Sequence, residues 1–252
     1  MNDSFDPIED LVASHGGRLR RAHAQHESAW RALRQTKITL EFVHWLDQKA
    51  HLQRKEWRNS PIGIEFDLIS NLQINAFATA NSSLEVVGIN AGLIIFLQNV
   101  FWALLSSDQF LPTFGSAKTE SKTAEDVGTY ISKTNIADGW GHLAPRDPER
   151  IVLAAELSRI AELFVFDHEV AHLTYGHVWH KKLLENRKVG IIFEYGSHYS
   201  NEQFRLMQAL EFDADEGATA KSIGFVLATL GQIPIILKTE ADMSDCIYGL
   251  SR

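Results

Sequence analysis

The sequence between Asp147 and Gly176 predicts one long, largely buried helix, and no other segment constrains the fold as strongly. Asp147 is a favoured N-cap, Pro148 suits the first helical position, and Gly176 is a favoured stop. Apolar residues recur at spacings of three and four between these ends, namely Ile151, Ala154, Ala155, Leu157, Ile160, Ala161, Phe164, Val165, Val170 and Ala171. A helix that is apolar over so much of its surface has to be covered by the rest of the chain.

The last turns of this helix carry the pattern His168-Glu169-Val170-Ala171-His172. Residues four apart lie on one helical face, about one turn apart, so both histidines can offer a ring nitrogen to the same Zn²⁺ ion. Glu169 between them is placed to act on a water molecule beside that ion. A pair of histidines at this spacing also occurs without any site, so the prediction depends on a third ligand.

The best source of a third ligand is a second helical pattern that opens at Asn201. Its apolar stripe consists of Phe204, Met207, Leu210 and Ala214. Glu211 and Asp215 are four apart and fall on one face of this helix. We expect Glu211 to be the third zinc ligand and Asp215 to accept a hydrogen bond from a ligand imidazole. The alternative is that both carboxylates belong to a solvated helix face.

These segments resemble the gluzincin metallopeptidases, including the HtpX and CAAX-prenyl-protease type. The resemblance rests on residues 168–172 with His177 five positions later, and on Glu211-Phe212-Asp213-Ala214-Asp215. A weaker match lies upstream, where Asn75-Ala76-Phe77-Ala78 and residues 86–93 resemble the strand and hairpin that precede the first helix in that group. The phage-exclusion Lit-type peptidases are the nearest in layout, and the matches together span residues 73–220.

The resemblance implies an α+β, zincin-like fold in which a small antiparallel sheet packs on the active-site helix and on a second ligand-bearing helix. It implies a zinc-dependent endopeptidase with one Zn²⁺ held by His168, His172 and Glu211. Its protein or peptide substrate would pair as an added strand along the sheet edge at residues 75–78. His177 is expected either near the zinc ligands or on the surface beyond the helix end. A Lit-type enzyme would cleave one specific host protein.

The mechanism expected from these residues is metal-assisted hydrolysis with Glu169 as the general base. A rival prediction is a zinc-stabilised sensor or binding protein that cleaves nothing. Glu169 favours the enzyme, because a purely structural zinc site has no need of a base and prefers four protein ligands.

The remaining sequence predicts one catalytic domain over residues 61–252 and an N-terminal helical extension over residues 1–60. Residues 18–58 carry ten Lys or Arg against four Asp or Glu in a helical pattern. Three apolar runs predict the strands of the sheet: the alternating series Ile62 to Leu68 and Leu72 to Ala76, and the run Val86 to Ile89. Residues 106–147 lack a long apolar period and predict a flexible insertion or a lid.

Charge and cysteine content indicate which partners and which cellular compartment to expect for this protein. The net charge of −8 argues against a general nucleic-acid binder. Cys246 is the only cysteine, so no intramolecular disulfide can form. The acidic N-terminus lacks the apolar core of a secretory signal. We therefore expect a cytoplasmic protein.

The apolar run from Val86 to Leu105 is about as long as a bilayer span and raises a third alternative, a membrane-bound quality-control protease. Asn90, Gln98 and Asn99 interrupt the run. We expect instead a strand that ends near Leu93 and a buried helix over residues 94–105, with no membrane contact.

Overall fold

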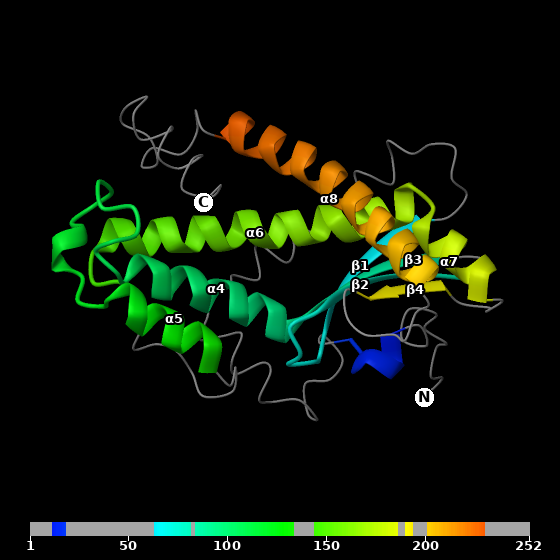
Figure 1. Ribbon diagram of the computed structural model, residues 1–252, viewed down its shortest axis with the longest axis horizontal. Coiled ribbons are helices and arrows are strands. Elements are labelled where there is room, and N and C mark those ends of the chain that lie inside the picture. Colours follow the sequence, from blue (N-terminus) through cyan, green and yellow to red (C-terminus); the bar gives the residue numbers. More distant parts are fainter. Residues whose placement is uncertain are drawn as a thin grey trace, which may run out of the picture. The chain divides into compact units, whose positions relative to one another are not determined.

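The computed structural model describes residues 12–18, 63–81, 84–133, 144–185, 190–193 and 201–229 (Figure 1). The chain forms two compact units, one built from Met1–Ile94 and Leu163–Lys221 and the other from Ile95–Glu162 and Ser222–Arg252. Most of the predicted N-terminal helical extension lies outside the described residues. Its described part, residues 12–18, contains the short 3-10 helix η1 (Ala13–His15).

The first unit contains a four-stranded sheet with the order β1-β3-β2-β4, which establishes the predicted α+β class. The strands are β1 (Gly63–Ile69), β2 (Ala76–Ala80), β3 (Leu84–Asn90) and β4 (Gly190–Phe193). β2 runs antiparallel to both β3 and β4, but β1 runs parallel to β3. The prediction of an antiparallel sheet is therefore wrong for one pair. β3 inserts between β1 and β2, so the connection from β1 to β2 has to cross the end of β3.

That crossing also explains why the second strand begins later than the alternation over residues 72–76 predicts. Residues 71–75 form a loop instead, held where the Asn71 carbonyl accepts a hydrogen bond from the Gly92 backbone N–H at 2.9 Å. A Cβ at Gly92 would lie 2.1 Å from the Leu72 carbonyl oxygen. Only glycine allows the loop to pass so close to the backbone after β3.

β2 is buried on both faces, because all five of its residues are buried and it lies between two other strands. A strand of this kind has no reason to alternate between apolar and polar residues. The Phe77 ring covers Gly88 of β3, where a Cβ would come within 2.4 Å of the ring. Phe77 also packs with Val12, Ile69 and Val86, so the N-terminal segment contributes to the core of this unit.

The long helix α6 (Pro148–Thr174) has the predicted ends. The Asp147 carboxylate accepts a hydrogen bond from the Arg150 backbone N–H at 3.0 Å, which is the expected N-cap contact. After the last turn, Gly176 adopts a φ of +77°, as a glycine does beyond a helix end. Within the first unit, Phe166 of α6 meets Phe66 of β1 edge-on, with ring centroids 5.6 Å apart. The sheet therefore packs on the half of α6 that carries the histidines.

Helix α4 (Ala91–Leu105) begins directly after β3, close to the predicted boundary near Leu93. Its first five residues are buried, and the amides of Gln98 and Asn99 are buried further along the helix. Among the helices of the described residues, none is long and apolar enough to cross a bilayer.

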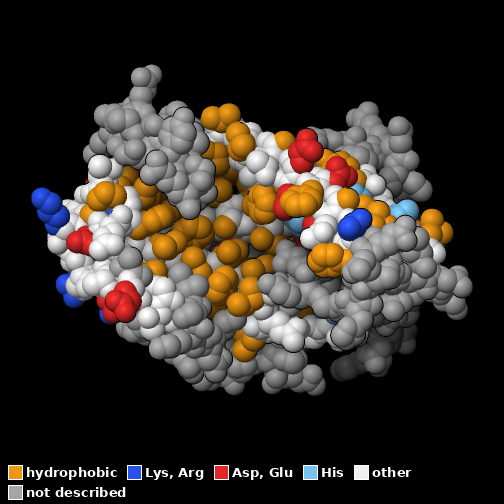
Figure 2. Space-filling view, in the orientation of Figure 1, with side chains coloured by type: hydrophobic (Ala, Val, Ile, Leu, Met, Phe, Trp, Pro, Cys, Tyr) orange, Lys and Arg blue, Asp and Glu red, His pale blue; other side chains and the backbone are white. Residues whose placement is uncertain are grey.

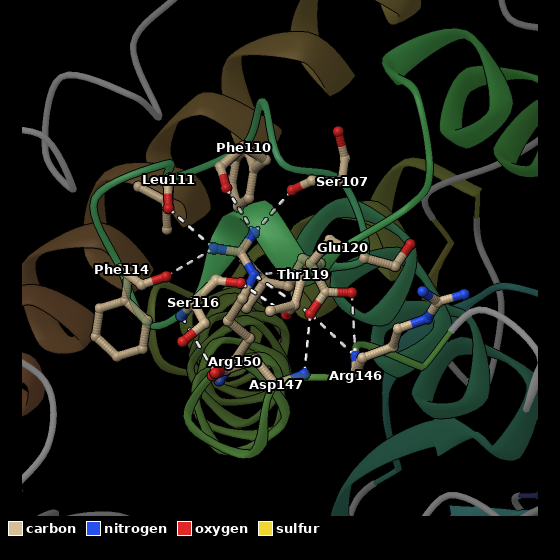
Figure 3. A network of polar contacts seen from close by, with 12 residues as sticks. Ser107, Phe110, Leu111, Phe114, Ser116, Thr119, Glu120, Arg146, Asp147 and Arg150 are labelled. Carbon is tan, nitrogen blue, oxygen red and sulfur yellow. Dashed lines mark hydrogen bonds and ion pairs between the residues drawn. The ribbon is translucent and has the colours of Figure 1, made fainter.

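The second unit contains η2 (Ala117–Thr119), α5 (Ala124–Lys133) and a loop that wraps the buried side chain of Arg150 (Figure 3). The five N–H groups of this guanidinium donate to backbone carbonyls, at 2.7 to 3.0 Å, from Leu105, Ser107, Phe110, Leu111 and Phe114. The described part of the predicted insertion thus has a specific polar core, a feature that its lack of apolar periodicity did not indicate.

Helices α7 (His177–Glu185) and α8 (Asn201–Thr229) follow α6. α7 packs against β4 and β2. The start of α8 at Asn201 agrees with the predicted opening of the second helical pattern. Several large apolar side chains of α8 stay exposed, namely Phe204, Phe212, Ile223 and Leu227. Figure 2, drawn in the orientation of Figure 1, shows apolar side chains at the surface.

Candidate metal centre

Helices α6 and α8 bring together His168, His172 and Glu211, the three predicted ligands. The Nε2 atoms of the two histidines are 3.0 Å apart. Glu211 Oε2 lies 3.2 Å from His168 Nε2 and 3.4 Å from His172 Nε2. Within the described residues, this is the one group of at least three potential ligands whose donor atoms converge in this way.

These separations fit a metal ion. Nitrogen and oxygen ligands bound to tetrahedral zinc at about 2.0–2.1 Å lie roughly 3.3–3.4 Å from one another. The observed separations of 3.0, 3.2 and 3.4 Å are close to that edge length. Two imidazoles and one carboxylate form the ligand set of many catalytic zinc sites, which keep a fourth position for water. The residues present therefore fit a metal ion with the ligand preferences of zinc.

His168 contacts Asp215, the residue that the sequence pattern predicts to orient a ligand imidazole. His168 Nδ1 lies 2.9 Å from Asp215 Oδ1. An ionised carboxylate can only accept hydrogen bonds, so Nδ1 carries the proton and Nε2 keeps its lone pair. That lone pair belongs to the nitrogen that faces the other two ligand atoms. The contact therefore selects the tautomer that binds a metal.

His172 begins a longer series of contacts through its other ring nitrogen, Nδ1. His172 Nδ1 lies 3.0 Å from Nδ1 of His177, at the start of α7. His177 Nε2 lies 3.0 Å from Asp213 Oδ2, on α8. His177 is buried and joins the site, rather than lying on the surface beyond the helix end.

Asp213 is the site residue that the sequence reasoning did not assign. Its neighbours Glu211 and Asp215 share a helical face, whereas Asp213 lies on a different part of the helix surface. The sequence signal that could have indicated Asp213 is the presence of a third histidine, His177, close to the pair. A third histidine close to the pair can hydrogen-bond to a carboxylate, and Asp213 is an acid between the two expected site residues of the second helix.

The charge states of the ligands suit a cation. Burial raises the pKa of Glu211, but the close imidazoles of His168 and His172 outweigh this effect and lower the pKa to about 2. Burial lowers the pKa of His172, chiefly because the charged imidazolium loses hydration there. At neutral pH, Glu211 is ionised and His172 is neutral, which are the forms that bind a metal.

Glu169 is 1% exposed and lies on α6 between the two ligand histidines, outside the group of converging donor atoms. Its role as a base stays a prediction. The predicted substrate edge requires a revision, because Phe77 and Ala78 of β2 already pair with Phe193 and Ile192 of β4. An added substrate strand has no free edge at these two residues. Substrate contact at Asn75 and Ala76 stays a prediction.

We predict that the purified chain binds one Zn²⁺, which His172→Ala loses and Glu211→Ala binds far more weakly, because each variant removes one of three protein ligands. Elemental analysis after dialysis measures the metal content. Wild-type zinc content in Glu211→Ala would contradict this ligand set, and Asp215 would then be the first substitute to test.

No family model, no curated protein and no solved structure matches this chain.

Proposed function

We propose that this protein is a zinc-dependent endopeptidase of the gluzincin type. The observation that carries the proposal is the convergence of His168 Nε2, His172 Nε2 and Glu211 Oε2 within 3.4 Å of one another. Glu169 lies in the same helical turn as the two histidines. A site of three protein ligands beside a carboxylate that does not join them is the arrangement of a catalytic rather than a structural zinc site.

A bound zinc ion would polarise a substrate carbonyl and lower the pKa of a coordinated water toward 7. The chain's own contribution begins with Glu169, whose carboxylate accepts a proton from the attacking water and delivers it to the leaving amine. His168 and His172 keep their Nε2 lone pairs for the metal because their Nδ1 atoms are engaged elsewhere. Glu211 stays ionised at neutral pH, since its pKa is about 2.

The alternative is a zinc-stabilised binding or sensor protein, and one observation favours it. His168 is 5% exposed and His172 is fully buried, and structural zinc sites are closed in this way. Against this, the converging group in the described residues supplies three ligands, whereas structural zinc sites are closed by four. Glu211 also retains 31% exposure of its side chain, which leaves an approach from solvent.

The substrate remains a proposal that rests on the sequence resemblance. A Lit-type role implies one specific host protein as the target, and the test therefore has to search many proteins at once. We predict that incubating the protein with a bacterial extract produces new protein N-termini, and that a zinc chelator abolishes them because the ligands lose their ion. Zinc, added back in excess of the chelator, should restore the same termini.

Mass-spectrometric profiling of N-termini measures the result, and His172→Ala serves as the metal-deficient control. Termini that persist in the presence of the chelator would come from another protease. A complete absence of new termini from a zinc-loaded protein would favour the binding alternative.

A further inference from the structure

We propose that His177 and Asp213 are positioning residues that hold His172 in its metal-binding tautomer. The inference rests on the metal centre proposed above and assigns a task to two residues beyond its ligand set. It is carried by an unbroken chain of contacts from Asp213 Oδ2 to His177 Nε2 and from His177 Nδ1 to His172 Nδ1, each 3.0 Å long.

The hydrogen bonds in this series of contacts have a fixed direction, because a carboxylate can only accept a hydrogen bond. Asp213 therefore accepts from His177, which places the His177 proton on Nε2 and leaves a lone pair on Nδ1. That lone pair can only accept from His172. The proton of His172 must then sit on Nδ1, and its Nε2 faces His168 and Glu211 with a free lone pair.

The opposite arrangement is unfavourable at both ends of the chain. If His177 donated from Nδ1, its Nε2 lone pair would face the Asp213 carboxylate at 3.0 Å. The proton of His172 would then sit on Nε2, on the side where the ligand atoms converge, and would block binding. The carboxylate of Asp213 therefore sets the tautomer of a ligand that it does not touch.

Burial strengthens the effect of Asp213 on the tautomer of His172. His172 is fully buried and His177 is 4% exposed, so water has little access to supply a substitute acceptor. Asp213 differs, since 55% of its side chain is exposed. A carboxylate this exposed can be removed without leaving a hole in the core, which makes it the cleanest position for a test.

Both ligand histidines are thus held by carboxylates of one helix, α8. Asp215 reaches His168 directly, and Asp213 reaches His172 through His177. Glu211 adds the third ligand from the same turns of α8. The chain therefore uses each acid at positions 211, 213 and 215 for a different task at one site.

The test measures zinc affinity by chelator competition on the full-length chain, and needs no substrate. Asp213→Ala should weaken zinc binding about 10–100-fold, the usual effect of losing an orienting partner of a metal ligand. Asp213→Asn should stay within about threefold of wild type, because its amide oxygen still accepts from His177 Nε2. Glu216→Ala, an exposed acid on the same helix, should bind zinc like wild type, whereas Asp215→Ala should weaken it.

A second set of variants asks whether Asp213 acts through His177. In a His177→Gln background, where the Gln amide oxygen can accept from His172, Asp213→Ala should cause no further loss of affinity. His180→Ala, an exposed histidine on α7, is the matched control. Thermal unfolding of the metal-free forms checks the fold, and the midpoint of Asp213→Ala should equal that of wild type.

Wild-type zinc affinity in Asp213→Ala would overturn the inference, and so would equal losses in Asp213→Ala and Asp213→Asn. Either result would leave the three-ligand centre intact. Conversely, a weakened Asp213→Ala together with a zinc-bound wild type that cleaves nothing would support the inference and overturn the peptidase. A wild type that binds no zinc would overturn both.

Discussion

Replacing Glu169 with Gln is expected to reduce peptide hydrolysis by at least about 100-fold, the lower end of what a positioned general base contributes. Gln has nearly the shape of Glu but cannot accept the proton of the attacking water. Glu169 lies outside the three converging ligand atoms, so zinc content should stay at the wild-type level. The readout is the set of new N-termini produced by equal amounts of zinc-loaded protein.

Glu162→Gln provides the matched control, because Glu162 is a second buried glutamate on α6, seven residues upstream. It should cleave like wild type. Equal cleavage by wild type and Glu169→Gln would show that Glu169 is not the base. A similar loss in Glu162→Gln would mean that hydrolysis responds to any change in the buried acids of α6 rather than to the loss of a base.

The second large effect concerns folding. Arg150→Met should destabilise the second unit by about 3–5 kcal/mol, the usual cost of breaking a buried charged network by removing one partner. The five carbonyls that Arg150 contacts would lose their donor while the loop around them stays buried. Glu120 would lose the positive charge that lies 3.9 Å from its carboxylate.

Arg150→Lys should recover only part of this loss, because an ammonium has three donors and no planar fork. Urea denaturation measures stability, and amide hydrogen exchange over residues 105–120 locates the effect. Arg146→Met is the control, since Arg146 is exposed and bonds Glu120 through its backbone N–H. If Arg150→Met and Arg146→Met unfold at the same urea concentration, the network contributes little stability. If Arg150→Met cannot be obtained folded, Arg150→Lys carries the measurement.

The sequence by itself determined the features that depend on neighbours along the chain. Asp147, Pro148 and Gly176 specified both ends of α6 because caps and stops act within a single turn. The spacing of His168 and His172 placed both on one face for the same reason. Glu211 and Asp215 could be predicted because they repeat that spacing on a second amphipathic helix.

Only the tertiary structure decided which distant groups meet. The parallel pairing of β1 with β3 depends on a loop that crosses the backbone at Gly92, and no periodicity in the strands records it. In the sequence, Arg150 is only a basic residue in the first turn of a helix. The structure shows that its guanidinium donates to backbone carbonyls within residues 105–114. Asp213 gains its partner only when α7 and α8 pack beside α6, because His177 lies 36 positions away in sequence. Residue spacing along the sequence indicates which side chains share a face of a helix. A buried polar network depends on which helix and loop surfaces pack together, and residue spacing does not indicate that.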